Sequence, residues 1–123
     1  MAHMQISRTI VVLDAADLDA VSSFWAGLLG GTVEPDDDWH TISVGGAPAM
    51  GIQLAPDHVQ PQWPDGTPQQ IHLDLHVEDV AVAHGEAMAL GARQLQAAGD
   101  LSAKQGFQVY ADPAGHPFCL CWG

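Results

Sequence analysis

Three side chains that can move protons or bind metals alternate along one short segment of the chain. His72, Asp74 and His76 are each separated by one residue, and alternate side chains of a β-strand lie on the same face, about 6.6 Å apart. An imidazole beside a carboxylate can serve as an acid–base pair, and residues placed this way can share a metal ion. His72 and Asp74 are therefore candidate catalytic residues, and all three are candidate ligand-binding residues. The simpler interpretation is that these histidines are ordinary surface residues.

Two other extended segments carry small or polar side chains on one face. Cys119 and Gln53 each lie between two apolar residues that must face a core. A sheet face that only met water would be expected to carry more Lys, Glu and Thr, so this choice of residues favours the lining of a pocket. We take Cys119 and Gln53 as candidate ligand-binding residues. The alternative is that Cys119, like Cys121, is a small buried hydrophobe, which is the more common role of such cysteines.

Two tryptophans lie where they could contact a ligand. Trp63 falls in a Pro-rich segment in which no core requires it, and Trp39 opens a short extended stretch. Flat rings at the mouth of a pocket can stack on a planar or hydrophobic molecule. An alternative for Trp63 is that it anchors the Pro-rich segment to its own domain. Trp25 and Trp122 are predicted to belong to the core.

The elements that must position these residues follow the same order in each half of the chain. Asp17 begins an amphipathic helix that ends at Gly30, and Asp79 begins a second helix that ends at Gly91. Leu29-Gly30 thus recurs as Leu90-Gly91 about half a chain later. Strands are predicted from β-branched and alternating residues at Ile6–Leu13, Thr32–Glu34, Trp39–Val44, Ala49–Ala55, Gln70–Val77, Arg93–Gln96, Gly106–Ala111 and His116–Trp122.

This order predicts an α+β protein built from two tandem βαβββ modules. The modules span residues 5–57 and 70–123 of one domain, and residues 58–69 form a semi-rigid, Pro-rich strap between them. Residues 1–4, Met-Ala-His-Met, resemble a cloning scar.

The charge balance excludes two classes of partner. The chain has 3 basic and 15 acidic residues, giving a formal net charge of −12, so nucleic acids and anionic membranes would repel it. No apolar run approaches the roughly 18 residues that span a bilayer, and no signal-peptide pattern opens the chain. The two cysteines lie too close together in one segment to staple the fold, which favours a reducing, cytoplasmic location.

Motifs along nearly the whole chain resemble the vicinal oxygen chelate superfamily, which contains glyoxalase I, extradiol dioxygenases, fosfomycin resistance enzymes and bleomycin-binding proteins. Each motif is weak alone, but their order and spacing are distinctive. The resemblance implies curved mixed sheets around a central cavity, the glyoxalase/bleomycin resistance/dioxygenase fold, and usually a homodimer. The motifs are Asp17-Leu18-Asp19, Phe24-Trp25, Leu28-Leu29-Gly30, Pro68–Asp74, Glu78-Asp79-Val80, Ala89–Ala92 and the Asp-Pro-x-Gly ending within Tyr110–Leu120.

The same resemblance implies metal ligands, usually His or Glu, on the first and last strand of each half. In the first half these positions fall at residues 9–11, which carry no convincing ligand, and near Gln53. In the second half they fall at His72 and at Cys119, where the family pattern has Glu. His72, Gln53 and Cys119 mix a soft thiolate with a neutral amide, so no cofactor is favoured. A divalent metal on these residues is the alternative.

Together these features predict a cytoplasmic small-molecule binding protein that sequesters a hydrophobic or aromatic natural product, such as an antibiotic, without a metal. In this hypothesis Trp39 and Trp63 stack on the ligand, and the polar candidates orient it. The alternative is an enzyme of the same superfamily, a lyase, isomerase or dioxygenase, that uses a metal or His72 and Asp74 as an acid–base pair.

Overall fold

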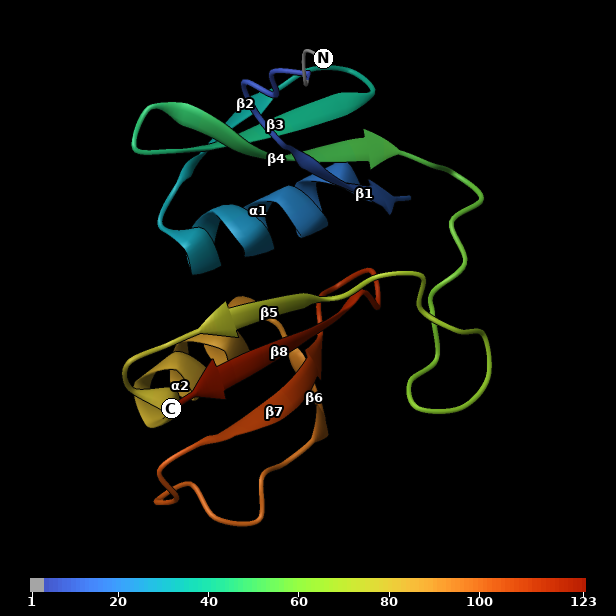
Figure 1. Ribbon diagram of the computed structural model, residues 1–123. Helices are drawn as coiled ribbons and strands as arrows, with labels where there is room; N and C mark the ends of the chain where they lie inside the picture. Colours follow the sequence, from blue (N-terminus) through green and yellow to red (C-terminus); the bar gives the residue numbers. More distant parts are fainter. Residues whose placement is uncertain (1–3) are drawn as a thin grey trace.

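The computed structural model describes residues 4–123, and it divides them into two modules of the same topology (Figure 1). The first module has one helix and four strands. The strands form a mixed sheet in the order β1-β4-β3-β2, in which β1 is parallel to β4. The elements of this module are β1 (Val11–Ala15), α1 (Leu18–Leu29), β2 (Thr32–Pro35), β3 (Trp39–Val44) and β4 (Ala47–Leu54).

The second module repeats the arrangement with the sheet order β5-β8-β7-β6, in which β5 is parallel to β8. Two βαβββ modules in one α+β protein are therefore confirmed. Residues 1–3 of the suggested cloning scar lie outside the described residues. The elements of the second module are β5 (Leu73–His76), α2 (Val80–Leu90), β6 (Arg93–Gln96), β7 (Gly106–Ala111) and β8 (Pro117–Trp122).

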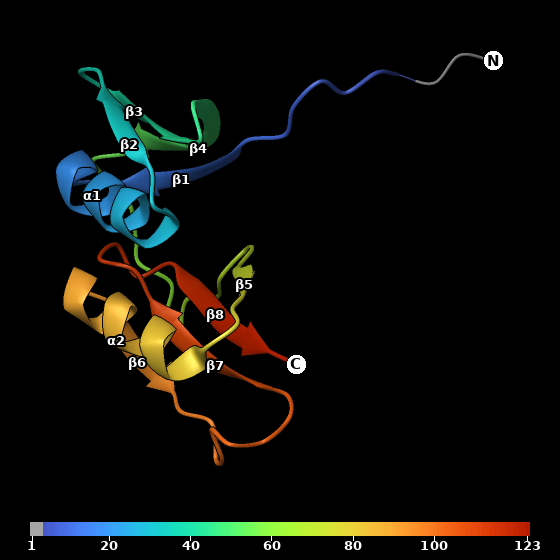
Figure 2. The ribbon, with the colours of Figure 1, turned by 90° about the vertical axis from the view of Figure 1, so that its left-hand side faces the viewer.

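The first strand of each module begins later than the side-chain pattern predicts. β1 starts at Val11 rather than Ile6, and β5 starts at Leu73 rather than Gln70. Each of these edge strands pairs with one neighbour only. Pairing begins inside that neighbour, at Met50 of β4, which starts at Ala47, and at Phe118 of β8, which starts at Pro117. Residues 4–9 are exposed, and Figure 2 shows this segment extending away from the rest of the chain. β-Branched side chains favour extended backbone, but a strand also needs a partner.

The two helices are delimited by the predicted residues. The carboxylate of Asp17 accepts a hydrogen bond from the amide of Ala20, and that of Asp79 accepts from two amides at the start of α2. These acceptors satisfy amide groups that have no partner within the helix. Gly30 and Gly91 end the helices with φ of 69° and 109°, a conformation that glycine adopts readily.

The core lies between the two sheets and joins the modules. Both helices lie on one side of the molecule, and α1 lies between the first sheet and the second module (Figures 1 and 2). The rings of Phe24 and Trp25 in α1 pack on Phe118 of β8, with centroids 5.7 and 5.2 Å apart. Trp25 is buried in this core as predicted, whereas Trp122 is half-buried at its edge.

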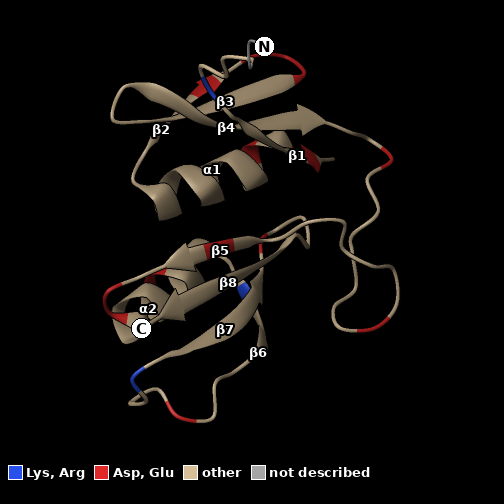
Figure 3. Cartoon of the chain, viewed as in Figure 1, with Lys and Arg blue, Asp and Glu red and all other residues tan. Residues whose placement is uncertain are grey.

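Acidic residues are largely absent from the strands. Figure 3 shows them mainly in loops and near the ends of elements, with Asp74 in β5. Five of the strands, β3, β4, β6, β7 and β8, contain no acidic residue. Among the described residues, no helix is long and apolar enough to cross a membrane.

Candidate functional site

Pairing of β5 with β8 brings three predicted site residues together on the outer face of the second sheet. Asp74 is the register partner of Cys119, and Nε2 of His72 lies 3.2 Å from Oδ1 of Asp74. One ligating atom from each of these three residues lies within 4.8 Å of the others. The alternation within each strand predicted these faces, and the strand register makes them one cluster.

A hollow of about 160 Å³ lies beside this cluster. Three of its lining residues, Trp63, His72 and Cys119, were predicted from the sequence. Phe107 and Val109 were not, although they alternate on β7, and Val109 is the register partner of Cys119. The complete lining consists of Trp63, Gln69, His72, Phe107, Val109, Pro117 and Cys119.

Gln69 is a further lining residue that sequence reasoning missed. Its amide nitrogen lies 3.5 Å from Nδ1 of His72, at the outer limit of a hydrogen bond. Its carbonyl oxygen Oε1 is shielded from solvent and has no hydrogen-bond partner within the described residues. An acceptor in this position is costly to leave unpaired, so it favours a donor group on a ligand or an ordered water.

The two cysteines are free, and their thiols are held in the protonated form. Burial is the main cause that raises the pKa of Cys119 from 9.0 to about 11, and the nearby carboxylate of Asp74 adds to it. The pKa of Cys121 is raised for the same two reasons. Because the thiolate is the nucleophilic form, Cys119 is suited near neutral pH to packing and weak hydrogen bonding rather than to covalent chemistry.

The other three predicted residues lie away from the hollow. His76 is exposed and pairs in register with Cys121. Trp39 and Gln53 are register partners in the first sheet. None of the three lines the hollow beside His72.

The indole of Trp39 closes the outer face of the first sheet. A Cβ atom added at Gly51 would clash with Cζ2 of Trp39, so the ring rests directly on the glycine. The indole nitrogen donates a hydrogen bond of 3.0 Å to the hydroxyl of Thr41. Trp39 therefore has a packing role that explains its presence without a ligand.

The metal site implied by the sequence resemblance does not fit these residues. Counting back from the helix caps Asp17 and Asp79, the first-module counterpart of His72 is Ile10. By the strand registers, the counterpart of Cys119 is Gly51. Neither offers a ligand atom, so a centre shared between the modules lacks half of its ligands. The cluster in the second module has the nitrogen, carboxylate and sulfur donors that zinc accepts, though its thiol is protonated.

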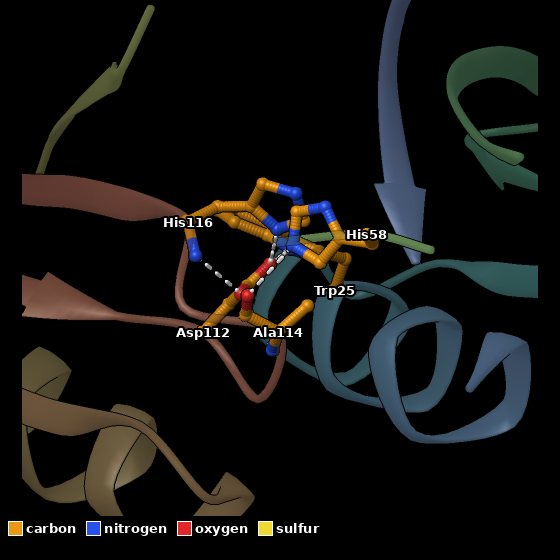
Figure 4. A network of polar contacts seen from close by, with 5 residues as sticks. All are labelled: Trp25, His58, Asp112, Ala114 and His116. Carbon is orange, nitrogen blue, oxygen red and sulfur yellow. Dashed lines mark hydrogen bonds and ion pairs between the residues drawn. The ribbon is translucent and has the colours of Figure 1, made fainter. Parts of the chain in front are cut away.

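A separate polar network joins the modules at the turn between β7 and β8 (Figure 4). The Asp112 side chain has no exposed surface. It accepts hydrogen bonds from the indole of Trp25 at 2.8 Å and from the ring of His116 at 2.7 Å. Backbone amides of Ala114 and His116 donate two more. The Asp-Pro-x-Gly motif signalled this turn, but not its contact with α1.

Comparisons with known proteins agree with this architecture. The sequence pattern of a family described as "Glyoxalase-like domain" matches residues 10–121, nearly the whole chain. The chain belongs to this glyoxalase-like family. No curated protein matches the sequence. Membership of the vicinal oxygen chelate superfamily, expected from the motifs, is thus confirmed.

Solved structures of the same fold include three glyoxalase relatives. The fosfomycin resistance protein FosX from Listeria monocytogenes has a TM-score of 0.73 at 14% identity, covering 98% of this chain and 93% of that one. A glyoxalase-related enzyme from Fulvimarina pelagi has a TM-score of 0.70 at 17% identity, with coverages of 96% and 89%. A glyoxalase/bleomycin resistance protein/dioxygenase family enzyme from Burkholderia phytofirmans PsJN has a TM-score of 0.69 at 17% identity, covering 92% of this chain and 95% of that one. At these identities the likeness establishes the fold alone.

Proposed function

We propose that this glyoxalase-like protein binds a small hydrophobic or aromatic molecule in the hollow of the second module, without a metal, and sequesters it. The observation that carries the proposal is the composition of that hollow. Rings or apolar groups of Trp63, Phe107, Val109 and Pro117 form its walls, and the polar groups of His72 and Gln69 lie among them. Ligand sites commonly combine apolar walls with a few placed polar groups.

The size of the hollow limits what it would enclose. A volume of about 160 Å³ is smaller than that of most drug-sized sites. It suits one ring or one short branch of a ligand, with the remainder lying over the sheet face. The unpartnered Oε1 of Gln69 would then select a group that donates a hydrogen bond.

Two features favour binding without a metal. The first module supplies Ile10 and Gly51 where a shared centre would need ligands. The thiol of Cys119, with a pKa of about 11, would have to lose its proton before it could bind an ion.

Tryptophan fluorescence tests the proposal directly. We expect indole, phenol or 1-naphthol, titrated in turn, to change the emission of the wild-type protein and of a Trp39→Phe variant. The same titration on Trp63→Phe should lose that response, because Trp63 lines the hollow and Trp39 does not. Equal responses from the two variants, or none from wild type, would contradict the proposal.

A second candidate function is acid–base catalysis by His72 and Asp74. The distance of 3.2 Å between Nε2 and Oδ1 favours it, because a carboxylate can orient and polarise an imidazole. A metal held by His72, Asp74 and Cys119 would instead favour a metal-dependent reaction. Elemental analysis of protein without a polyhistidine tag separates these cases. Stoichiometric zinc, lost in His72→Ala, would overturn metal-free binding.

We further propose that the protein is a cytoplasmic homodimer. The apolar side chains of Met4 and Ile6 are 70% and 68% exposed in the segment that precedes β1. A second copy could cover them. Light scattering during size-exclusion chromatography should give twice the mass of 13.0 kDa. The monomer mass would contradict this proposal.

A further inference from the structure

A second hollow, larger than the first, opens between the strap and the starts of β1 and β5. Its volume is about 400 Å³, within the range of small-molecule sites. It meets the smaller hollow at Gln69 and Pro117, which line both. The lining residues are Val12, Leu13, Asp14, His58, Val59, Pro61, Pro68, Gln69, Gln70, Ile71, His116 and Pro117.

Two histidines in this lining have their tautomers fixed by hydrogen bonds. Nδ1 of His116 donates to the buried carboxylate of Asp112 at 2.7 Å. Nε2 of His58 donates to the backbone carbonyl of Ala114 at 3.0 Å. In a neutral ring the remaining nitrogen is an acceptor, so Nε2 of His116 and Nδ1 of His58 each present a lone pair. Within residues 4–123, no hydrogen bond engages either atom.

The two lone pairs face the same way. The rings lie 5.0 Å apart between centroids, with 32° between their planes. Figure 4 shows their outer nitrogens on the same side, away from Asp112 and Ala114. The buried Asp112 fixes one ring, and the backbone fixes the other.

Two further hydrogen-bond acceptors line the same hollow, and its lining contains no Lys or Arg residue. They are the exposed carboxylate of Asp14 and Gln69, whose Oε1 is shielded and unpartnered. Gln70 adds an amide, which can donate as well as accept. A site rich in acceptors and poor in donors suits a ligand that donates several hydrogen bonds and carries positive charge.

The rest of the lining is apolar and open to a hydrophobic group. Val59 and Ile71 are 68% and 61% exposed, although both are large aliphatic residues. Two prolines of the strap and Val12 of β1 extend this surface. Covering such side chains with an apolar group releases water and stabilises a complex.

We propose that this hollow is a second binding site, for a protonated amine with an apolar body. The ammonium group donates to His58 Nδ1 and His116 Nε2 beside the carboxylate of Asp14, and the apolar body covers Val59 and Ile71. This site adjoins the hollow at Trp63, with which it shares Gln69 and Pro117, but the proposed contacts of the ammonium group involve neither residue.

Ring spacing favours an ammonium over a metal ion. Two acceptors that each lie about 2.9 Å from a tetrahedral ammonium are roughly 4.7 Å apart. Two nitrogens bound to one tetrahedral metal at about 2.1 Å are only roughly 3.4 Å apart. The two rings are tilted by 32° with their centroids 5.0 Å apart, a ring spacing closer to the first arrangement than to the second.

The test compares benzylammonium with benzyl alcohol, which has the same ring and no charge. Proton NMR at pH 8, above the range in which imidazoles ordinarily titrate, follows the ring signals of each histidine. We expect benzylammonium to shift the His58 and His116 signals and to bind at least tenfold more tightly than the alcohol. Equal affinity for the two probes, or shifts at His72 instead, would overturn the proposal.

Two variants sharpen the test while leaving the Asp112 network in place. His58→Phe keeps a stacked ring without an acceptor, and it should weaken benzylammonium binding about tenfold. Asp14→Asn should weaken it several-fold, whereas Asp65→Asn, an equal charge change in the exposed part of the strap, should leave it unchanged. Equal losses in the two Asp variants would mean that the net charge alone attracts the probe. Since the site at Trp63 is followed by fluorescence with uncharged aromatics, failure of either proposal is seen separately.

Discussion

In the first module the position that corresponds to Cys119 is Gly51, and the indole of Trp39 fills the space above it. In the second module the same position carries a thiol beside His72 and Asp74, open to a hollow. The two sheets share strand order and parallel pairing. The two modules thus share a backbone topology while their outer faces differ, one closed by packing and one open at a hollow.

The corresponding turns of the two modules also differ, because only the turn of the second module carries polar side chains. The turn between β3 and β4 is Gly45-Gly46 and has no side chains to offer. The turn between β7 and β8 is longer and carries Asp112 and His116, which reach α1 through Trp25. The second module therefore supplies both the open face and the polar contact that joins the halves.

Removal of the Asp112 carboxylate should have the largest effect on stability. Asp112→Ala leaves the indole nitrogen of Trp25 and two backbone amides buried without their acceptor. We expect the free energy of unfolding in urea to fall by roughly 3 kcal/mol or more. Asp65→Ala, in an exposed part of the strap, should change it by about 0.5 kcal/mol or less. A loss below about 1 kcal/mol for Asp112→Ala would show that the turn does not hold the modules together.

The reactivity of the Cys119 thiol should show that burial and the neighbouring carboxylate of Asp74 raise its pKa. In a Cys121→Ser background, alkylation by iodoacetamide should be slow at pH 8 and should rise toward pH 11, following a pKa of about 11. The rate at pH 8 should be roughly ten- to a hundredfold below that in urea, because only the thiolate reacts. Asp74→Asn should speed the reaction, since it removes a neighbouring negative charge.

The same pKa fixes the direction of a stability change with pH. The folded protein holds the Cys119 proton between pH 9 and about 11, whereas the unfolded chain with an ordinary pKa of 9.0 releases it. The contribution of this group to the free energy of unfolding is therefore complete below pH 9 and is lost as the pH rises to 11. If the alkylation rate of Cys119 reached half of its maximum near pH 8, both the expected reactivity and the expected pH dependence of stability would be contradicted.

Gly51→Ala tests whether the first module is closed by packing. The added methyl group would meet the Trp39 ring, and we expect a loss of roughly 1–3 kcal/mol in the free energy of unfolding. Gly85→Ala in α2 is the matched control, because no atom lies within 4 Å of its added Cβ. This control should raise the free energy of unfolding by about 0.5–1 kcal/mol, because alanine has a higher helix propensity than glycine. If Trp39→Leu does not relieve the cost of Gly51→Ala, the ring is not its cause.

The helix caps should show the smallest difference between the modules. Asp17→Ala removes one hydrogen bond and Asp79→Ala removes two. Each should lower the free energy of unfolding by about 1 kcal/mol, with the larger loss at Asp79. Thermal unfolding followed by circular dichroism measures both. A larger loss at Asp17 would mean that the hydrogen bonds do not set the cost.

Local signals predicted much of this fold. The caps Asp17 and Asp79, with the glycines that follow each helix, set the helix ends as expected. The start of β1 was predicted wrongly because side-chain pattern does not show which residues pair. β4 pairs no residue of this segment before Val11, although β4 itself begins at Ala47. Propensity describes a residue, whereas a strand boundary depends on two segments.

The candidate site was predicted only in part, because its contacts also join segments that are far apart in the sequence. Alternation placed His72 and Asp74 on one face, but the register that sets Asp74 against Cys119 involves a distant strand. The contact of Trp39 with Gly51 also crosses strands. Trp25 and Asp112, 87 positions apart, could not be joined from local pattern.

The buried carboxylate at the last turn also shows what the Asp-Pro-x-Gly ending does in this chain. Here its aspartate binds an indole of the opposite half and the amides of its own loop, with no surface left to meet a substrate. In this chain the ending therefore marks the place where the two modules interlock, a structural role that the carboxylate performs without facing solvent.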